Sequence, residues 1–240
     1  MQYYVLPEWV ALPQAWALTL NQPDIMHHIS RVMRLKPWKQ IILQTYGYWN
    51  QPITRAVCTI TEITKEACIV AVDQYDQFQA LNTSWPLLVL SLLNTHQRLE
   101  RAVQKCTEIG VHRIAIVTTQ YSPQFSVNQK KKDRAESIAR EALEQSHWIH
   151  MPYIERFNSL EELHAQYECS QISYADCATT STVLSESIAD CYCIWPEWGW
   201  WERDYEFFKK TAAQPFSLWT TILRAETAAV VTWWELQKSS

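Results

Sequence analysis

Glycine is nearly absent from this chain. Only 3 of its 240 residues are glycine, whereas 13 are tryptophan. Average usage of about 7% predicts roughly 17 glycines in a chain of this length. The counts of glycine and tryptophan together come close to that number. This composition indicates that many of the tryptophans stand where glycines belong.

Long apolar runs are also missing. No run reaches the roughly 18 residues that a membrane-spanning helix needs. The opening residues, MQYYVLPEWV, lack the basic start and continuous apolar core of a signal peptide. We therefore expect a soluble protein of the cytosol with no membrane partner.

The seven cysteines show no zinc-like spacing, since Cys191 and Cys193 are one residue apart and the others are scattered. We expect reduced, mostly buried thiols and no metal. A net charge of −4 argues against a surface that binds nucleic acid everywhere, but it allows a local basic patch.

The first third of the chain favours β-structure. Segments rich in β-branched and aromatic residues alternate with polar turns, and they predict strands at 2–6, 40–45, 54–63 and 67–72. One helix is expected at 23–35, where Pro23 and Asp24 suit a first turn and Ile25, Ile29 and Val32 form an apolar stripe. This pattern predicts a small barrel with one helix.

The chain then changes to strands that alternate with helices. Strands are expected at 87–93, 113–117, 171–175, 192–194 and 215–218, and helices at 97–109, 130–146, 202–211 and 225–236, with another opened by Ser159. This alternation predicts an α/β domain whose parallel sheet has helices on both faces. The expected domains are 1–73 and 87–240, joined by a linker at 74–86.

Three loops of this α/β region fall at the carboxyl ends of predicted strands, where such sheets bind ligands. They cover 174–179, 195–201 and 218–229. The last loop contains Arg224, Glu226 and Thr227 at a helix start. These side chains suit either ligand binding or helix capping, and their spacing alone favours capping.

Four segments carry a resemblance to a known family. They are LLNTHQRLERAVQKCTEIGVHRIAIVTT (92–119), RAESIAREALEQS (134–146), CIWPEWGW (193–200) and FSLWTTILRAETAA (216–229). In order and spacing they resemble the bacterial 16S rRNA uracil-N3 methyltransferases of the SPOUT superfamily. That family's strongest signatures are G-P-E-G-G followed by an aromatic residue, and L-G followed shortly by I-L-R-x-E-T-A. The N-terminal HHISRVMRLKPW (27–38) resembles a family segment that ends in L-K-P-G.

Tryptophan occupies glycine positions of these motifs at 38, 195, 198 and 219. Trp9 and Trp49 also fall where turns are expected, and Trp201 is a further candidate, whereas Trp200 matches the family's aromatic residue. UGA differs by one base from the glycine codon GGA, and some bacteria read UGA as glycine. One hypothesis is that UGA glycine codons are rendered here as tryptophan; the alternative is a degenerate homologue with real tryptophans. UGG codons at 195, 198 and 219 would rule out the first hypothesis.

The resemblance implies a trefoil-knotted SPOUT domain after a PUA-like β-barrel, with S-adenosylmethionine (SAM) as the cofactor. The implied cofactor-binding residues lie on the three loops: Tyr174, Ala175, Asp176, Trp195, Pro196, Glu197, Trp198, Gly199, Ser217, Leu218, Trp219, Ile222, Leu223 and Arg224.

Methylation at uracil N3 requires an unstacked base and the loss of the N3 proton. The candidate catalytic residues are Arg224, Glu197, Glu226 and Arg140, although each type is more often structural at such positions. RNA-side candidates on the long helix also include Glu141.

The expected partners are 16S rRNA in the small ribosomal subunit and a second copy of the chain in a homodimer. The candidate RNA-binding residues are Arg31, Arg34, Lys36, Gln145 and Ser146. The chain differs from many relatives in two ways: it lacks an early arginine pair, and it has Gln120 and Tyr121 after a predicted strand. These differences weaken the RNA-side assignments more than those of the cofactor site.

Two other functions remain open at this stage. The chain can be an inactive RNA-binding or ribosome-associated homologue whose cofactor cleft is filled by real tryptophans. A doubly wound nucleotide-binding enzyme is disfavoured, since no G-x-G-x-x-G follows the first α/β strand and no P-loop is present.

Overall fold

The structure is a computed structural model of the whole chain. It describes residues 1–7, 10, 12, 16–48, 50–80, 85–93, 95–120, 129–177, 184, 189–218 and 221–238; of residues 129–133 it describes only the backbone. The chain forms two compact units. One contains Met1–Asn82 together with Leu143–Met151, and the other contains Thr83–Ala142 together with Pro152–Ser240.

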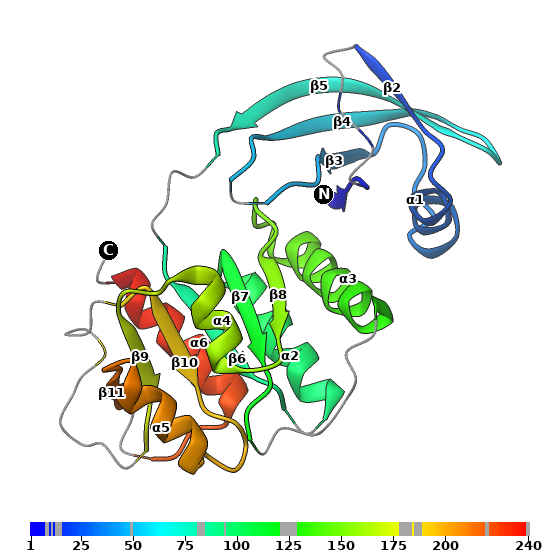
Figure 1. Cartoon of the computed structure of the whole chain (residues 1–240). Coiled ribbons are helices and arrows are strands. Elements are labelled where there is room, and N and C mark those ends of the chain that lie inside the picture. The colour runs from blue at the N-terminus through cyan, green and yellow to red at the C-terminus, as the bar shows by residue number, and fades with distance from the viewer. Residues whose placement is uncertain are drawn as a thin grey trace. The chain divides into compact units, whose positions relative to one another are not determined.

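The first unit contains a curled, mixed five-stranded sheet (Figure 1). Its strands are β1 (Gln2–Val5), β2 (Ala17–Leu20), β3 (Gln40–Gln44), β4 (Ile53–Ile63) and β5 (Cys68–Phe78), in the order β1-β3-β4-β5-β2. β1 and β3 run parallel, and the other pairs are antiparallel. The pairing of β4 with β5 shifts register twice, and such bulges increase strand bending. The curled sheet agrees with the expected barrel.

Apolar residues that alternate along these strands build the core of this unit. Ile41 and Leu43 of β3 are fully buried, as are Cys58 and Ile60 of β4, and Ile29 packs into the same cluster from the helical segment. This alternation follows from the two-residue period of a strand, which directs every second side chain to one face.

The helix expected at 23–35 is shorter and changes character. An α-helical turn, α1 (Pro23–His27), continues as a π-helical segment, η1 (His28–Val32). Arg34 then adopts a left-handed φ of 49°, and the Leu35 amide bonds the Ile29 carbonyl at 2.9 Å. The left-handed Arg34 and this bond, which spans six positions, close the end of the helical segment after Val32.

The segment Leu143–Met151 joins the first unit through polar contacts. The Glu144 carboxylate accepts a hydrogen bond from the Val5 amide at 2.9 Å. The Gln44 amide nitrogen donates to the Ile149 carbonyl at 2.7 Å, and Arg55 donates to the His147 carbonyl at 3.1 Å. In the first contact a side chain of the segment satisfies a backbone amide of β1, and in the other two side chains of the sheet satisfy backbone carbonyls of the segment.

The second unit contains a parallel six-stranded sheet in the order β11-β9-β10-β6-β7-β8. The strands are β6 (Leu87–Ser91), β7 (Arg113–Val117), β8 (Tyr153–Phe157), β9 (Ile172–Ala175), β10 (Cys191–Ile194) and β11 (Gln214–Phe216). All five residues of β6 and all four of β10 are buried, as expected for central strands covered on both faces.

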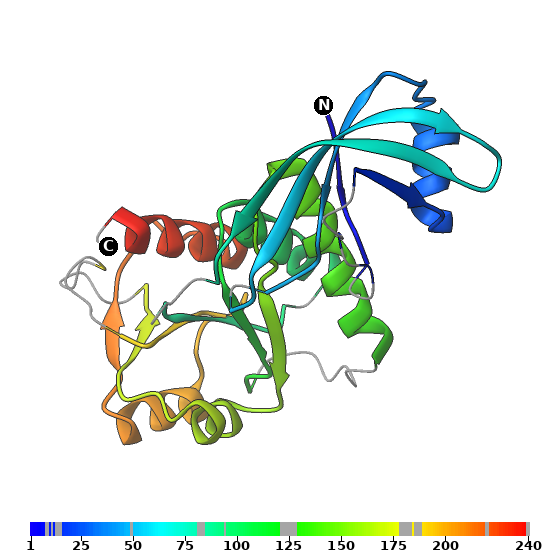
Figure 2. The ribbon, with the colours of Figure 1, turned by 90° about the horizontal axis from the view of Figure 1, so that it is seen from above.

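Helices cover both faces of this sheet. They are α2 (His96–Glu108), α3 (Gln129–Ser146), α4 (Leu160–Tyr167), α5 (Glu202–Lys210) and α6 (Ala225–Lys238). Viewed from above, α6 lies on one side of the sheet, and α4 and α5 lie on the other (Figure 2). The α/β class and the parallel sheet with helices on both faces are confirmed.

Three expectations about single elements need correction. β5 continues to Phe78, so the first part of the expected linker at 74–86 is strand, because it pairs with β4 as far as Ile53. Strands β2 and β8 were not expected, since their sequences are short and only partly apolar. Residues 81–84 of the linker lie outside the described residues.

Candidate functional site

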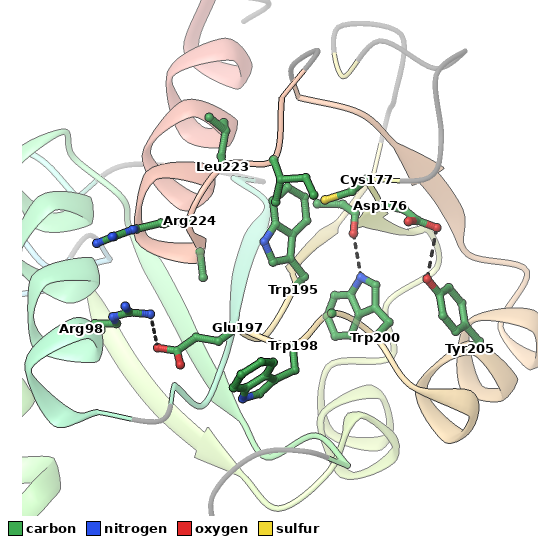
Figure 3. A pocket seen from close by; sticks show the side chains of 14 residues that line it. Arg98, Asp176, Cys177, Trp195, Glu197, Trp198, Trp200, Tyr205, Leu223 and Arg224 are labelled. Atoms are coloured by element: carbon green, nitrogen blue, oxygen red, sulfur yellow. Dashed lines mark hydrogen bonds and ion pairs between the residues drawn. The ribbon is translucent and has the colours of Figure 1, made fainter.

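A cleft of about 540 Å³ lies in the second unit where loops leave the carboxyl ends of parallel strands (Figure 3). Its walls come from the residues after β9, from the loop after β10, from the residues before and at the start of α6, and from single side chains of α2 and α5. The volume is within the range of small-molecule sites, about 300–1,000 Å³. The lining residues are Arg98, Ala175, Asp176, Cys177, Trp195, Glu197, Trp198, Gly199, Trp200, Tyr205, Ile222, Leu223, Arg224 and Ala225.

The loop after β10 is fixed at both ends. At its start, the buried Ser91 hydroxyl donates to the Ile194 carbonyl at 2.9 Å. At its end, the Trp200 indole donates to the Ala175 carbonyl at 2.7 Å. Gly199 has a φ of 77°, and its amide bonds the Pro196 carbonyl at 2.9 Å, so the loop makes a tight turn that needs a left-handed residue.

An ion pair crosses one end of the cleft. An Arg98 guanidinium nitrogen lies 2.6 Å from a Glu197 carboxylate oxygen, and the two side chains are 35% and 15% exposed. Arg224 is exposed and lies on the same side of the cleft in Figure 3. Two guanidinium groups and one carboxylate therefore give this end a net positive charge.

The opposite end of the cleft holds Asp176 and Tyr205. The Tyr205 hydroxyl donates to the Asp176 carboxylate at 3.4 Å. Burial, followed by the nearby Asp176 charge, raises the pKa of Tyr205 to about 12. Burial and Asp176 also raise the pKa of the Cys177 thiol. The tyrosine and the thiol therefore remain protonated at neutral pH and act here as hydrogen-bonding groups rather than bases.

Aromatic rings pack behind the Asp176 end of the cleft. Tyr174 stacks on Phe208 with ring centroids 4.0 Å apart and planes 1° apart, and Trp200 meets Phe208 edge-on at 4.9 Å. These contacts couple the end of β9 to α5. Tyr174 thereby supports the cleft without lining it.

Most of the expected cofactor residues come together in this cleft. Nine of them line it: Ala175, Asp176, Trp195, Glu197, Trp198, Gly199, Ile222, Leu223 and Arg224. Four others do not line it, namely Tyr174, Pro196, Ser217 and Leu218. Trp219 lies outside the described residues.

The catalytic candidates separate into two groups. Glu197 and Arg224 line the cleft, whereas Glu226 and Arg140 do not. Glu226 is in the first turn of α6, and one of its carboxylate oxygens is buried without a hydrogen-bond partner in the described part of the chain. Arg140 is on α3.

The RNA-binding candidates all lie in the first compact unit. Arg31, Arg34 and Lys36 are exposed around the end of η1, and Gln145 and Ser146 are exposed at the end of α3. The Ser146 hydroxyl accepts a hydrogen bond from the Trp148 amide at 3.3 Å, which also gives it a structural role in the turn after α3.

Two lining residues lie outside the three loops expected from the sequence. Arg98 is in the first turn of α2, where a cation is unfavourable beside the positive end of the helix dipole. That misplaced charge was the signal that it has a carboxylate partner elsewhere. Tyr205 gave no comparable signal, because an exposed aromatic residue on an amphipathic helix is ordinary.

Within the described residues, no helix is long and apolar enough to cross a membrane. Nor does this part of the chain contain a cluster of three or more His, Cys, Asp or Glu side chains that suits a metal ion.

Comparison with known proteins identifies relatives of the whole chain. Ribosomal RNA small subunit methyltransferase E of Bacillus subtilis is 25% identical over 224 residues, which cover 85% of this chain and 83% of that protein. Two solved structures share the fold at 20% identity, and both cover 99% of this chain and 97% of their own. One is ribosomal RNA small subunit methyltransferase E of Neisseria gonorrhoeae bound to S-adenosyl methionine, with a TM-score of 0.79. The other, from Legionella pneumophila with bound SAM, has a TM-score of 0.80.

The family match is decisive for classification. The family described as RNA methyltransferase domain matches residues 82–237, which is more than half of the chain and includes every residue that lines the cleft. The chain therefore belongs to the RNA methyltransferase domain family.

Proposed function

We propose that this protein transfers a methyl group from SAM to N3 of a uridine in 16S rRNA of the small ribosomal subunit. The observation that carries the proposal is the convergence of three loops, which brings the loop residue Asp176 and the motif residues Glu197 and Arg224 into one cleft. The B. subtilis relative, whose name gives the same class of substrate, supports it.

The residues present fit SAM in size and in charge. The cleft is large enough for a nucleoside with an amino-acid arm, and its apolar walls suit the adenine ring. We propose that Asp176 orients the ribose and that Arg224 receives negatively charged groups such as the SAM carboxylate. When bound, SAM supplies an electrophilic methyl group.

The chain's own groups then have to hold the uracil and accept a proton. Uracil N3 is on the base-pairing edge, so the target base must be unstacked before it can enter. We propose that Glu197 or Glu226 receives the N3 proton, because both carboxylates lie at or beside the loops that form the cleft. Arg224 stabilises the negative charge that forms on the uracil oxygens.

Methylation of isolated ribosomal subunits tests this function. The purified protein, radiolabelled SAM and small subunits that lack the modification are expected to yield N3-methyluridine by nucleoside mass spectrometry. Arg224→Ala should abolish the product while circular dichroism stays unchanged. A wild-type protein that binds SAM but methylates no small subunit would contradict the proposal.

One observation favours a second function, an inactive RNA-binding homologue. Trp195 is 7% exposed and Trp198 is 73% exposed, and both indoles line the cleft that SAM needs. Calorimetry with SAM separates the two functions, since a filled cleft gives no heat of binding.

The remaining parts of the proposal concern partners and location. We propose that Arg31, Arg34, Lys36, Gln145 and Ser146 contact the RNA, and that residues 1–73 and 87–240 act as RNA-binding and catalytic domains joined by the linker. A homodimer in the cytoplasm, with no metal, completes the proposal; sedimentation at several concentrations measures the dimer.

A further inference from the structure

We infer that Arg98 is a positioning residue that holds Glu197 in the wall of the cleft. The inference rests on the proposed function. Arg98 is on α2 and Glu197 follows β10, so the pair joins segments that are 99 positions apart. Their 2.6 Å separation is typical of a strong, charge-assisted hydrogen bond.

The location of Glu197 makes such a partner necessary. Glu197 is in the middle of the turn closed by the Gly199 amide and the Pro196 carbonyl. The Ser91 and Trp200 hydrogen bonds fix the two ends of the loop, but they do not orient its central carboxylate. Arg98 supplies that orientation from the first turn of α2.

The positive charge of Arg98 in the first turn of α2 also needs an explanation. An arginine in the first turn of α2 is unfavourable for the helix itself. The contact with Glu197 offsets that cost, and with Arg224 at the same end of the cleft it leaves this end without net negative charge. An anionic RNA strand can then approach.

A double-mutant cycle tests this inference. We expect Arg98→Ala to lower kcat/KM for methyl transfer about tenfold, and Arg98→Lys to restore part of it. If Arg98 acts through Glu197, Arg98→Ala has no further effect in a Glu197→Ala background. SAM affinity by calorimetry and kcat and KM for the subunit are measured separately for each variant.

The outcomes separate this inference from the proposed function. If the wild-type protein is active and the effects of the two substitutions are additive, the positioning role of Arg98 is wrong but the proposed function stands. An inactive wild-type protein overturns the proposed function instead. Lys105→Ala, which removes an exposed pair with Glu108 on the same helix, is the matched control and should leave kcat/KM unchanged.

A second inference rests on different observations, the conformations of the tryptophans. We propose that Trp16, Trp38 and Trp198 are encoded by UGA codons that the organism reads as glycine. The three indoles are 90%, 80% and 73% exposed. Tryptophan is usually well buried, because its large apolar ring gains most from leaving water.

The backbone at Trp38 is the strongest single observation. Its φ is 73°, in the left-handed region, and the Lys39 amide bonds the Lys36 carbonyl at 3.3 Å. Pro37 occupies the second position of this turn and Trp38 the third. A proline followed by a positive φ is the pattern of a type II turn, whose third position requires glycine or asparagine. An indole there stays 80% exposed, and its Cβ makes the positive φ unfavourable.

Other tryptophans of the same chain behave as real ones. Trp200 is 6% exposed and its indole donates to Ala175, and Trp233 is fully buried against His112 and Trp85. Among the described tryptophans, Trp195, Trp200 and Trp233 are buried, Trp201 and Trp234 are 43% and 54% exposed, and Trp16, Trp38 and Trp198 project furthest into solvent. A one-base codon difference, UGA against UGG, accounts for the three most exposed ones.

Stability measurements test the backbone argument independently of any activity. We expect Trp38→Gly to raise Tm by roughly 2–4 °C, since glycine adopts positive φ at no steric cost. Trp38→Ala removes the indole but keeps a Cβ, so its Tm should rise by less than that of Trp38→Gly. Trp200→Gly is the control that should lower Tm. A Trp38→Gly protein that melts at or below the wild-type temperature overturns the argument.

The gene and the native protein decide the proposal directly. UGA codons at 16, 38 and 198, with UGG at 200 and 233, support it. Peptide mass spectrometry of the protein from its own organism should find glycine at the first three positions and tryptophan at the other two. UGG at 38 or 198, or tryptophan in those peptides, overturns it.

Discussion

Single residues determine the chemistry of the two ends of the cleft. One end of the cleft is formed by Tyr205 and Asp176, and its tyrosine hydroxyl keeps its proton. The other end is formed by three charged side chains, Arg98, Glu197 and Arg224. A bound molecule therefore meets a hydrogen-bond donor at one end and guanidinium groups at the other. This asymmetry fixes the direction in which a charged ligand can lie.

The raised pKa of Tyr205 predicts how stability changes at alkaline pH. The side chain ionises near 10.0 in an unfolded chain and at about 12 in the folded protein. Between these values the unfolded state binds fewer protons, so the free energy of unfolding falls as pH rises from 10 and levels off above about 12. Urea unfolding at several pH values measures this fall.

Tyr205→Phe is the matched variant, because it keeps the ring and removes the ionising group. It should unfold with a shallower loss of stability over the same pH interval. An identical loss in both proteins would show that Tyr205 does not contribute; Tyr3, whose pKa burial also raises to about 12, is the next residue to substitute.

Among the helices, α4 offers the clearest capping interaction. The Ser159 hydroxyl accepts a hydrogen bond from the Glu162 amide at 3.1 Å, and Glu161 and Glu162 lie in the first turn. We expect Ser159→Ala to lower the free energy of unfolding by about 1 kcal/mol, since an amide at the helix start loses its partner. Urea unfolding checks this, and Ser159→Asp should retain most of the stability. Equal stability of Ser159→Ala and the wild type would contradict the capping role.

The elements differ in how far they could be predicted from the sequence. Strongly apolar β6 and β10 and the periodic helices α2 and α3 were predicted within a few residues. The strands β2 and β8 were not, because partial burial leaves a weak pattern. The end of η1 was missed as well, because its termination depends on backbone geometry at Arg34 rather than on glycine or proline.

For the site, the sequence allowed the loops to be predicted but not the side-chain contacts between distant segments. The strand-to-helix loops at 174–177 and 195–199 follow from the α/β alternation and the motifs. The Arg98 contact depends on β6 and β10 becoming neighbours across a hundred positions, and no local pattern encodes that pairing. The cofactor role of each lining residue, and the knotted path of the chain, stay predictions.

On the scale of the whole molecule, the reactivity of the cysteine thiols shows whether both units are folded. Six of the seven cysteines are buried, and Cys177 is exposed beside the cleft. Burial raises the pKa of Cys58 and Cys106 to about 12 and that of Cys68 to about 11. Buried, protonated thiols react slowly because the thiolate is the nucleophile.

We therefore expect one thiol of the native protein to react with a disulfide reagent at pH 8, and all seven to react in denaturant. Cys177→Ser should remove the fast reaction. If SAM occupies the cleft, it should slow that reaction in the wild type. Several fast thiols in the native protein would contradict the burial of the other six.

The strand order of the second unit has a consequence for synthesis on the ribosome. β6 is made early, yet its neighbour β10 is made about a hundred residues later and is inserted between β6 and β9, which has already been made. Contacts between such distant segments form slowly, because the intervening chain must be ordered first. During translation the nascent chain therefore carries one face of the cleft exposed, and ligand binding has to wait until residues 191–225 have left the exit tunnel.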